Sequence, residues 1–97
     1  MVLLAFLTIG MQVFAQNSVS GKVTDTKGEP LVGASVLIKG TNTGTMTDLD
    51  GQYKLPGVSA NSVLVFSSIG YETKEATVGS QKTINVALAD EAEFLDD

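Results

Sequence analysis

The sequence predicts an all-β fold, a small β-sandwich of about seven strands that follows an apolar leader. Short β-prone segments recur roughly every ten residues, a spacing that is typical of a sandwich and not of βαβ units. Several of these segments alternate apolar and polar residues with a period of two, and no segment after residue 15 shows a helical period. Two layers of strands are therefore expected.

The leader, residues 1–15, is almost wholly apolar. It is shorter than the roughly 20 residues that span a bilayer, but it suits the hydrophobic region of a secretory signal peptide. Val13 and Ala15 are small enough for the −3 and −1 positions of a signal peptidase site, so Gln16 is the expected first mature residue. No Lys or Arg precedes the run, which leaves open a start upstream of Met1. A buried first strand or helix is the less favoured alternative.

Residues 16–89 suffice for one small domain with a modest core. The chain has no Cys, so its stability must come from strand pairing and a packed apolar interior. Period-two alternation predicts a first strand that ends at Asp25 and a second strand over 34–39. The Gly and Pro of 26–30 predict a turn between them, and a loop is expected at 40–44. The apolar or small residues that alternate along these two strands are Val19, Gly21, Val23, Ala34, Val36 and Ile38.

The segment 48–51, Asp-Leu-Asp-Gly, lies between two short β-prone runs and predicts a β-hairpin. Gly51 accepts the positive φ of a tight turn, and the carboxylates of Asp48 and Asp50 can accept hydrogen bonds from nearby backbone amides. Pro56 and Gly57 are expected to close the hairpin. A calcium loop is the disfavoured alternative, because Gly comes two residues too early and no Glu stands at the twelfth position.

Three further segments complete the predicted sheets. Residues 63–66 are an unbroken apolar run, which indicates a strand that is central in its sheet or covered on both faces. Residues 71–78 alternate again and carry charges of both signs, as expected near a sheet edge. After a turn at 79–81, the last strand is predicted at 83–88, where Ile84, Val86 and Leu88 alternate with less apolar residues.

Residues 90–97 hold five of the eleven acidic residues. The rest of the chain has six acids and six lysines, so the formal charge of −5 belongs to this tail, which is expected to be solvated and disordered. The negative charge and the absence of Arg disfavour nucleic-acid binding.

The composition also argues against catalysis. The chain has no His and no Cys, which removes the usual nucleophile–base pairs and soft metal ligands. No catalytic, metal-binding or cofactor-binding residue is predicted, and the protein is not expected to be an enzyme. Tyr53 and Tyr71 are interpreted as core or interface residues in preference to sugar-stacking platforms.

Three segments, 19–36, 43–55 and 66–73, resemble in order and spacing the carboxypeptidase-regulatory-like domain. This family has a small, Greek-key-type sandwich like that of transthyretin. The family-motif residues, which the resemblance implies are structural, are Gly21, Gly33, Gly44, Thr47, Asp48, Asp50, Gly51, Tyr53, Gly70 and Tyr71.

The tail adds a second resemblance. Leu95-Asp96-Asp97 looks like the acidic segment that follows this domain in SusC/RagA-like TonB-dependent outer-membrane receptors, ahead of a TonB-contacting stretch, a plug and a barrel. The resemblance implies a non-catalytic N-terminal extension of a receptor for glycan or peptide uptake, located at the periplasmic face of the outer membrane. Its expected partners are periplasmic proteins or the plug and barrel of the same receptor.

The same resemblance implies that 97 residues are a fragment that stops before the TonB-contacting segment, since a closed barrel needs many more strands. Two alternatives stay open at this point. One is a sandwich module of another exported protein, such as a surface glycan-processing or adhesion protein, and the other is direct ligand binding by the domain.

Overall fold

The computed structural model of this protein describes residues 17–91. The predicted signal segment, 1–15, and residues 92–97 of the predicted tail lie outside the described residues. Seven strands are present, and no helix is assigned to residues 17–90. The strands are β1 (Asn17–Asp25), β2 (Ser35–Ile38), β3 (Gly44–Met46), β4 (Gln52–Val58), β5 (Val63–Ser67), β6 (Lys74–Thr77) and β7 (Val86–Leu88). Within the described part of the chain, no helix has the length and apolar character needed to cross a membrane.

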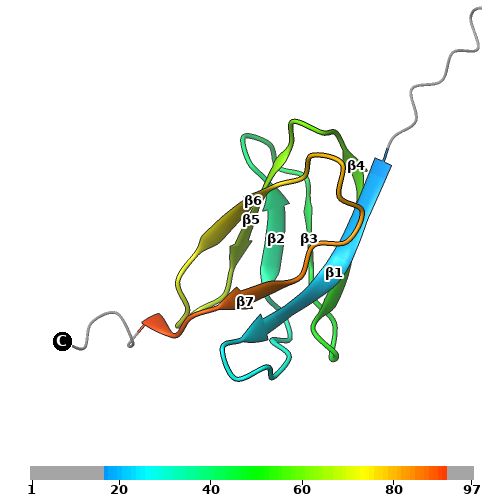
Figure 1. Cartoon of the computed structure of the whole chain (residues 1–97). Helices are drawn as coiled ribbons and strands as arrows, with labels where there is room; N and C mark the ends of the chain where they lie inside the picture. The colour runs from blue at the N-terminus through cyan, green and yellow to red at the C-terminus, as the bar shows by residue number, and fades with distance from the viewer. Residues whose placement is uncertain (1–16, 92–97) are drawn as a thin grey trace, which may run out of the picture.

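The strands form two packed sheets, which confirms the predicted sandwich (Figure 1). One sheet has three strands in the order β4-β1-β7, and the other has four in the order β3-β2-β5-β6. Alternate side chains of both sheets point inward, as the period-two patterns predict. The buried core is Val19, Val23, Ala34, Val36, Ile38, Tyr53, Leu55, Val58, Leu64, Phe66, Val78, Ile84, Val86 and Leu88.

Strand β1 organises the three-stranded sheet because it pairs on both sides. It is antiparallel to β4, with Gly21 opposite Tyr53, and parallel to β7, with Val23 opposite Val86. Upstream of β7, the amide of Ile84 donates to the carbonyl of Ser20 at 2.9 Å. A Cβ added at Gly21 would overlap the carbonyl of Ile84, so only Gly permits this approach of the two segments.

The predicted hairpin over 43–55 is wrong. Strand β3 pairs with β2 in the four-stranded sheet, whereas β4 pairs with β1 in the other sheet. The turn at 48–51 is real, with the Gly51 amide donating to the Asp48 carbonyl at 2.9 Å, but it carries the chain from one sheet to the other. Local turn chemistry is the same in both cases, so the sequence signal did not distinguish a hairpin from a crossing between layers.

The predicted end of this element at Pro56 and Gly57 is also wrong, because β4 continues to Val58. The pairing of β1 with β4 shifts register between Asn17 and Ser18, whose partners are Val58 and Pro56. Gly57, with φ of 78°, is the extra residue of this bulge. A bulge at the rim of a sheet accommodates Pro56, which cannot donate a hydrogen bond to the neighbouring strand, so β4 continues past it.

The four-stranded sheet confirms the prediction for residues 63–66 and the edge position predicted for 71–78, but the strand there is shorter than predicted and begins at Lys74. Strand β5 lies between β2 and β6, hence centrally, and β6 is an edge. Of the apolar run, Leu64 and Phe66 are fully buried, while Val63 and Val65 are only half-buried on the outer face. The run is therefore central in its sheet but not covered on both faces.

We expect Gly21→Ala to destabilise the domain by about 3 kcal/mol or more, because the added Cβ has to push β1 away from the backbone of Ile84. Ser20→Ala is the matched control, since it changes the neighbouring position of the same strand and should shift stability by less than about 0.5 kcal/mol. Urea unfolding measured by circular dichroism compares the two. Equal midpoints for both variants would contradict the close approach at Gly21.

Candidate functional site

The connection between the sheets is held by Thr47, a buried polar residue that directly follows β3. Its hydroxyl donates to the carbonyl of Leu31 at 2.6 Å and accepts from the amide of Ala34 at 2.8 Å. Its backbone adds bonds to Ala34 and to the amide of Gly33. Thr47 therefore ties the loop that enters β2 to the loop that leaves β3, which is a structural role.

Asp48 shapes the turn that follows. Its Oδ1 accepts hydrogen bonds from the amides of Asp50 at 2.9 Å and Gln52 at 2.8 Å. Gly51 has a φ of 78°, and its carbonyl oxygen accepts a hydrogen bond from the amide of Val23 in β1 at 2.8 Å. These contacts confirm the interpretation of 48–51 as a turn held by a carboxylate. Asp50 is exposed, and no hydrogen bond to its carboxylate is present among the described residues.

Tyr53 lies at the centre of the core, facing Gly21 across the β1–β4 pair. Its hydroxyl donates to the carbonyl of Ile84 at 2.7 Å, and its ring meets that of Phe66 edge-on, with 5.6 Å between centroids. Burial raises the pKa of the Tyr53 hydroxyl to about 12, because the phenolate would lose its hydration in the core. Tyr53 is thus a core residue and offers no surface for a sugar.

The remaining motif residues are dispersed. Gly33 and Gly70 are exposed in loops, while Gly44 stands in β3 opposite Leu37. Tyr71 is half-buried and packs against the core. The predicted motif therefore does not converge on one pocket, and its residues hold turns and strand contacts in different parts of the sandwich.

Gly70 and Tyr71 have a second role, because they hold the chain as it leaves the domain. The amide of Glu91 donates to the carbonyl of Gly70 at 2.9 Å, and the amide of Glu72 donates to Ala89 at 2.8 Å. Tyr71 and Asp90 form an antiparallel bridge between these bonds. The backbone of Asp90 and Glu91 is therefore anchored, so the expectation of a disordered tail was wrong for these two residues.

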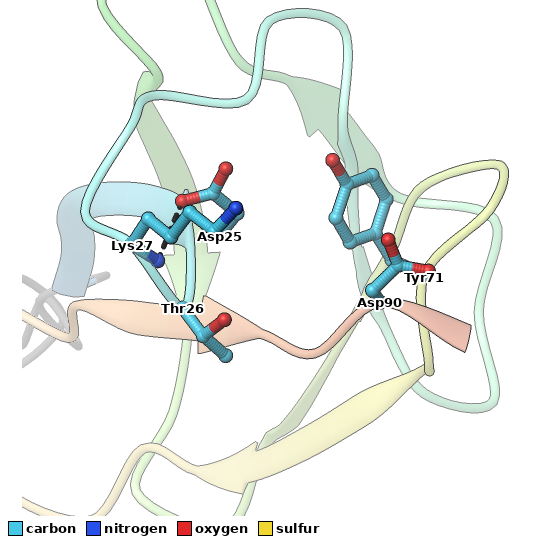
Figure 2. Close-up of a pocket in the computed structure, with 5 residues that line it drawn as sticks. All are labelled: Asp25, Thr26, Lys27, Tyr71 and Asp90. Carbon is cyan, nitrogen blue, oxygen red and sulfur yellow. Dashed lines mark hydrogen bonds between the residues drawn. The ribbon is translucent and has the colours of Figure 1, made fainter. Parts of the chain in front are cut away.

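A hollow of about 190 Å³ opens beside this exit and is the candidate site drawn in Figure 2. Asp25, Thr26 and Lys27 line one side of it, and Tyr71 and Asp90 line the other. Oδ1 of Asp25 is already engaged, since it accepts from the amides of Lys27 at 2.8 Å and Glu29 at 2.9 Å. The hollow thus presents carboxylates and a phenol, but one of these carboxylates serves to hold the turn after β1.

The polar side chains that line this hollow are two carboxylates, a hydroxyl, an ammonium group and a phenol. Within residues 17–91, no three acidic side chains lie close enough together to hold a metal ion. The two carboxylates of the hollow have no His or Cys beside them, because the chain has none.

Sequence reasoning missed Asp25 and Asn85, although both have recognisable roles. The carboxylate of Asp25 caps the turn after β1, and Oδ1 of Asn85 accepts from the amide of Lys22 at 2.9 Å, in place of a backbone acceptor. The Asp-Thr-Lys-Gly sequence could have revealed the first, since Asp favours such turns. The role of Asn85 depends on two segments that are 63 residues apart, so no local signal exists.

A family model described as the CarboxypepD_reg-like domain matches residues 19–97. The chain belongs to the CarboxypepD_reg-like family. Curated relatives support this assignment. The TonB-dependent receptor SusC of Bacteroides thetaiotaomicron is 43% identical over the whole of this chain, and a TonB-dependent receptor of Formosa agariphila is 43% identical over 86% of it. A second receptor of Formosa agariphila is 50% identical over 72% of the chain.

The CarboxypepD_reg-like chain spans only 10%, 8% and 7% of the length of these three receptors. Among solved structures, chains of two type II cohesin–X-dockerin complexes from Acetivibrio cellulolyticus match with a TM-score of 0.59 and 22% identity. The match covers 72% of this chain and 52% of each of those chains. At this identity the likeness concerns the fold alone.

Asp48→Ala should destabilise the CarboxypepD_reg-like domain by about 1–2 kcal/mol, because two turn amides lose their acceptor. Asp50→Ala removes a carboxylate of the same turn that has no such bonds and should cost less than about 0.5 kcal/mol. Chemical unfolding of both variants tests the difference. A larger effect of Asp50→Ala would contradict the assignment of Asp48 as the residue that holds the turn.

Stability should fall between pH 10 and 12 because of Tyr53. The folded state keeps the proton up to about pH 12, while the unfolded chain loses it near 10, so the folded state binds more protons in that interval and stability decreases as the pH rises. Tyr71→Phe leaves Tyr53 as the single tyrosine, so that phenolate absorbance reports it alone. We expect a midpoint near 12. A midpoint near 10 in the folded protein would contradict the burial of the Tyr53 hydroxyl.

Proposed function

We propose that this chain is the N-terminal periplasmic domain of a SusC-type TonB-dependent outer-membrane receptor for nutrient uptake, and that it acts by binding other protein surfaces. The observation that carries the proposal is the match to SusC. It extends over the whole chain at 43% identity and so includes the residues that precede and follow the β-sandwich. Two receptors of another bacterium match 86% and 72% of the chain. Nutrient, in this proposal, means a glycan or a peptide.

The chemistry of the domain supports binding over catalysis. Two of its polar side chains at motif positions, the hydroxyl of Thr47 and the carboxylate of Asp48, bond backbone groups. Surfaces available for contact are the loops at both ends of the sandwich and the sheet edges, among them β6. A binding module with a rigid core and loops at its ends is suited to hold a partner near the receptor.

The coding DNA beyond Asp97 tests the first part of the proposal. We expect the reading frame to continue into a TonB-contacting segment, a plug and barrel strands. A stop codon, or an unrelated domain in that position, would overturn the assignment to a receptor.

Deletion of codons 16–89 in the full-length gene tests the role of the domain. The leader and the acidic segment are retained, so export is preserved. We expect the barrel to reach the outer membrane in normal amount while growth on the transported nutrient falls. The amount of barrel in purified outer membranes is the control. Unchanged growth, with the barrel present, would contradict a contribution of the domain to uptake.

A further inference from the structure

The two ends of the sandwich differ in their exposed apolar side chains. Three loops, 26–34, 47–51 and 68–73, lie at the end of the sandwich where the chain leaves the domain (Figure 1). We call these loops, together with the end of β3 and residues 89–91, the exit face. The opposite end carries the loops 39–43, 59–62 and 78–83. In the described part of the chain, all large apolar side chains that are exposed lie on the exit face. They are Val32 (57% exposed), Met46 (63%), Leu49 (83%) and Ile69 (100%).

The segments that carry these residues are joined to one another at the exit face. The Thr47 hydroxyl bonds the carbonyl of Leu31, which links the loops of Val32 and Leu49. Met46 stands opposite Ser35 on β2, and Ser35 stands opposite Ser67 on β5. Ser35 and Ser67 also line a shallow hollow of about 310 Å³ together with Ile69. The segments that carry the apolar side chains are thus neighbours at one end of the sandwich, with Ser35 and Ser67 between Met46 and Ile69.

Packing of the domain core does not explain why these apolar side chains are present at the surface. Ile69 is fully exposed and Leu49 nearly so, hence neither contributes to the core. Loop tips are ordinarily polar, and a single exposed apolar residue has no particular meaning. One such residue on each of the three loops at one end, with none on the three loops at the other end, is typical of a surface that is covered in the assembled protein.

The charges of the exit face add a second feature. Six of the eight carboxylates in residues 17–91 lie on the exit face, and Lys27 is the one lysine among the same loops. The six are Glu29, Asp48, Asp50, Glu72, Asp90 and Glu91, and a seventh, Asp25, ends β1 beside this face. Apolar tips within a negatively charged rim match a partner surface that is apolar and bordered by Lys or Arg.

We propose that the exit face is the docking surface for the part of the same polypeptide that follows Asp97, which on the proposed function is the rest of the receptor. The chain leaves the domain at this face, since the Glu91 amide is bonded to Gly70, the neighbour of Ile69. Residues 92–97 can span at most about 20 Å, so whatever follows them starts close to the exit face. Such a short tether holds the following domain at an effective concentration of about 1 mM or more near the exit face, so even weak apolar contacts suffice for docking. The occupant is therefore a domain of the same chain with an apolar, basic-rimmed surface.

Cysteine labelling of the full-length receptor tests this inference. The 97 residues contain no Cys, so single cysteines can be introduced in a receptor whose remaining cysteines, if any, are replaced. Ile69→Cys and Leu49→Cys probe the exit face, and Asn42→Cys is the matched control, an exposed position at the opposite end. We expect maleimide to label positions 49 and 69 about tenfold more slowly than position 42, as for a surface that is docked nine-tenths of the time. In the 97-residue chain without the rest of the receptor, all three should react alike.

A photo-crosslinker attached at Ile69→Cys identifies the occupant. We expect crosslinks to peptides that lie beyond Asp97 in the same polypeptide. Equal labelling of all three positions in the full-length receptor, or crosslinks to a second copy or to another protein, would overturn the inference while leaving the receptor assignment intact. A reading frame that lacks the receptor would overturn both, and the DNA sequence shows this before any labelling.

Discussion

The close contact of β1 with residues 83–84 is the constraint on which the three-stranded sheet depends. Gly21 leaves room for the backbone of Ile84, and the hydroxyl of Tyr53 passes over this space to bond the Ile84 carbonyl. The absence of one side chain therefore allows both the parallel pairing of β1 with β7 and the burial of a tyrosine hydroxyl with its partner. A core of this size has little free energy to lose, so one such contact carries much of the stability of the sheet.

The 47–51 connection relates this sheet to the other one. Thr47 bonds the loop before β2, while Gly51 bonds β1, so two neighbouring parts of one short segment hold opposite layers. The Asp48 carboxylate keeps the backbone between them in a single shape. The side chains of Thr47 and Asp48, two polar residues of the family motif, are thus occupied with backbone groups.

The exit face combines residues that hold the backbone with residues that are exposed at the loop tips. Its loops are held by Thr47, Asp25 and the Gly70–Glu91 bond, and their tips carry the side chains that fold stability does not need. A rigid sandwich that presents adaptable loops at one end is a common means of building a binding surface. In a receptor whose other parts are joined to this end, such a surface would set how the domain sits against its neighbours.

Alternation and turn chemistry in the sequence alone determined the approximate positions of the strands, the inward faces, the edge character of β6 and the turn at 48–51, because these depend on residues close in the chain. The bounds were less well determined, since β6 and β7 each begin three residues later than predicted. Tertiary structure decided which strands pair: β3 and β4 lie in different sheets, β4 continues past Pro56, and Asn85 bonds a strand that is distant in sequence. It also decided that Val32, Leu49 and Ile69, which are far apart in the chain, share one end. The physical reason is that layer choice and loop clustering depend on packing between distant segments, which leaves no local pattern to read.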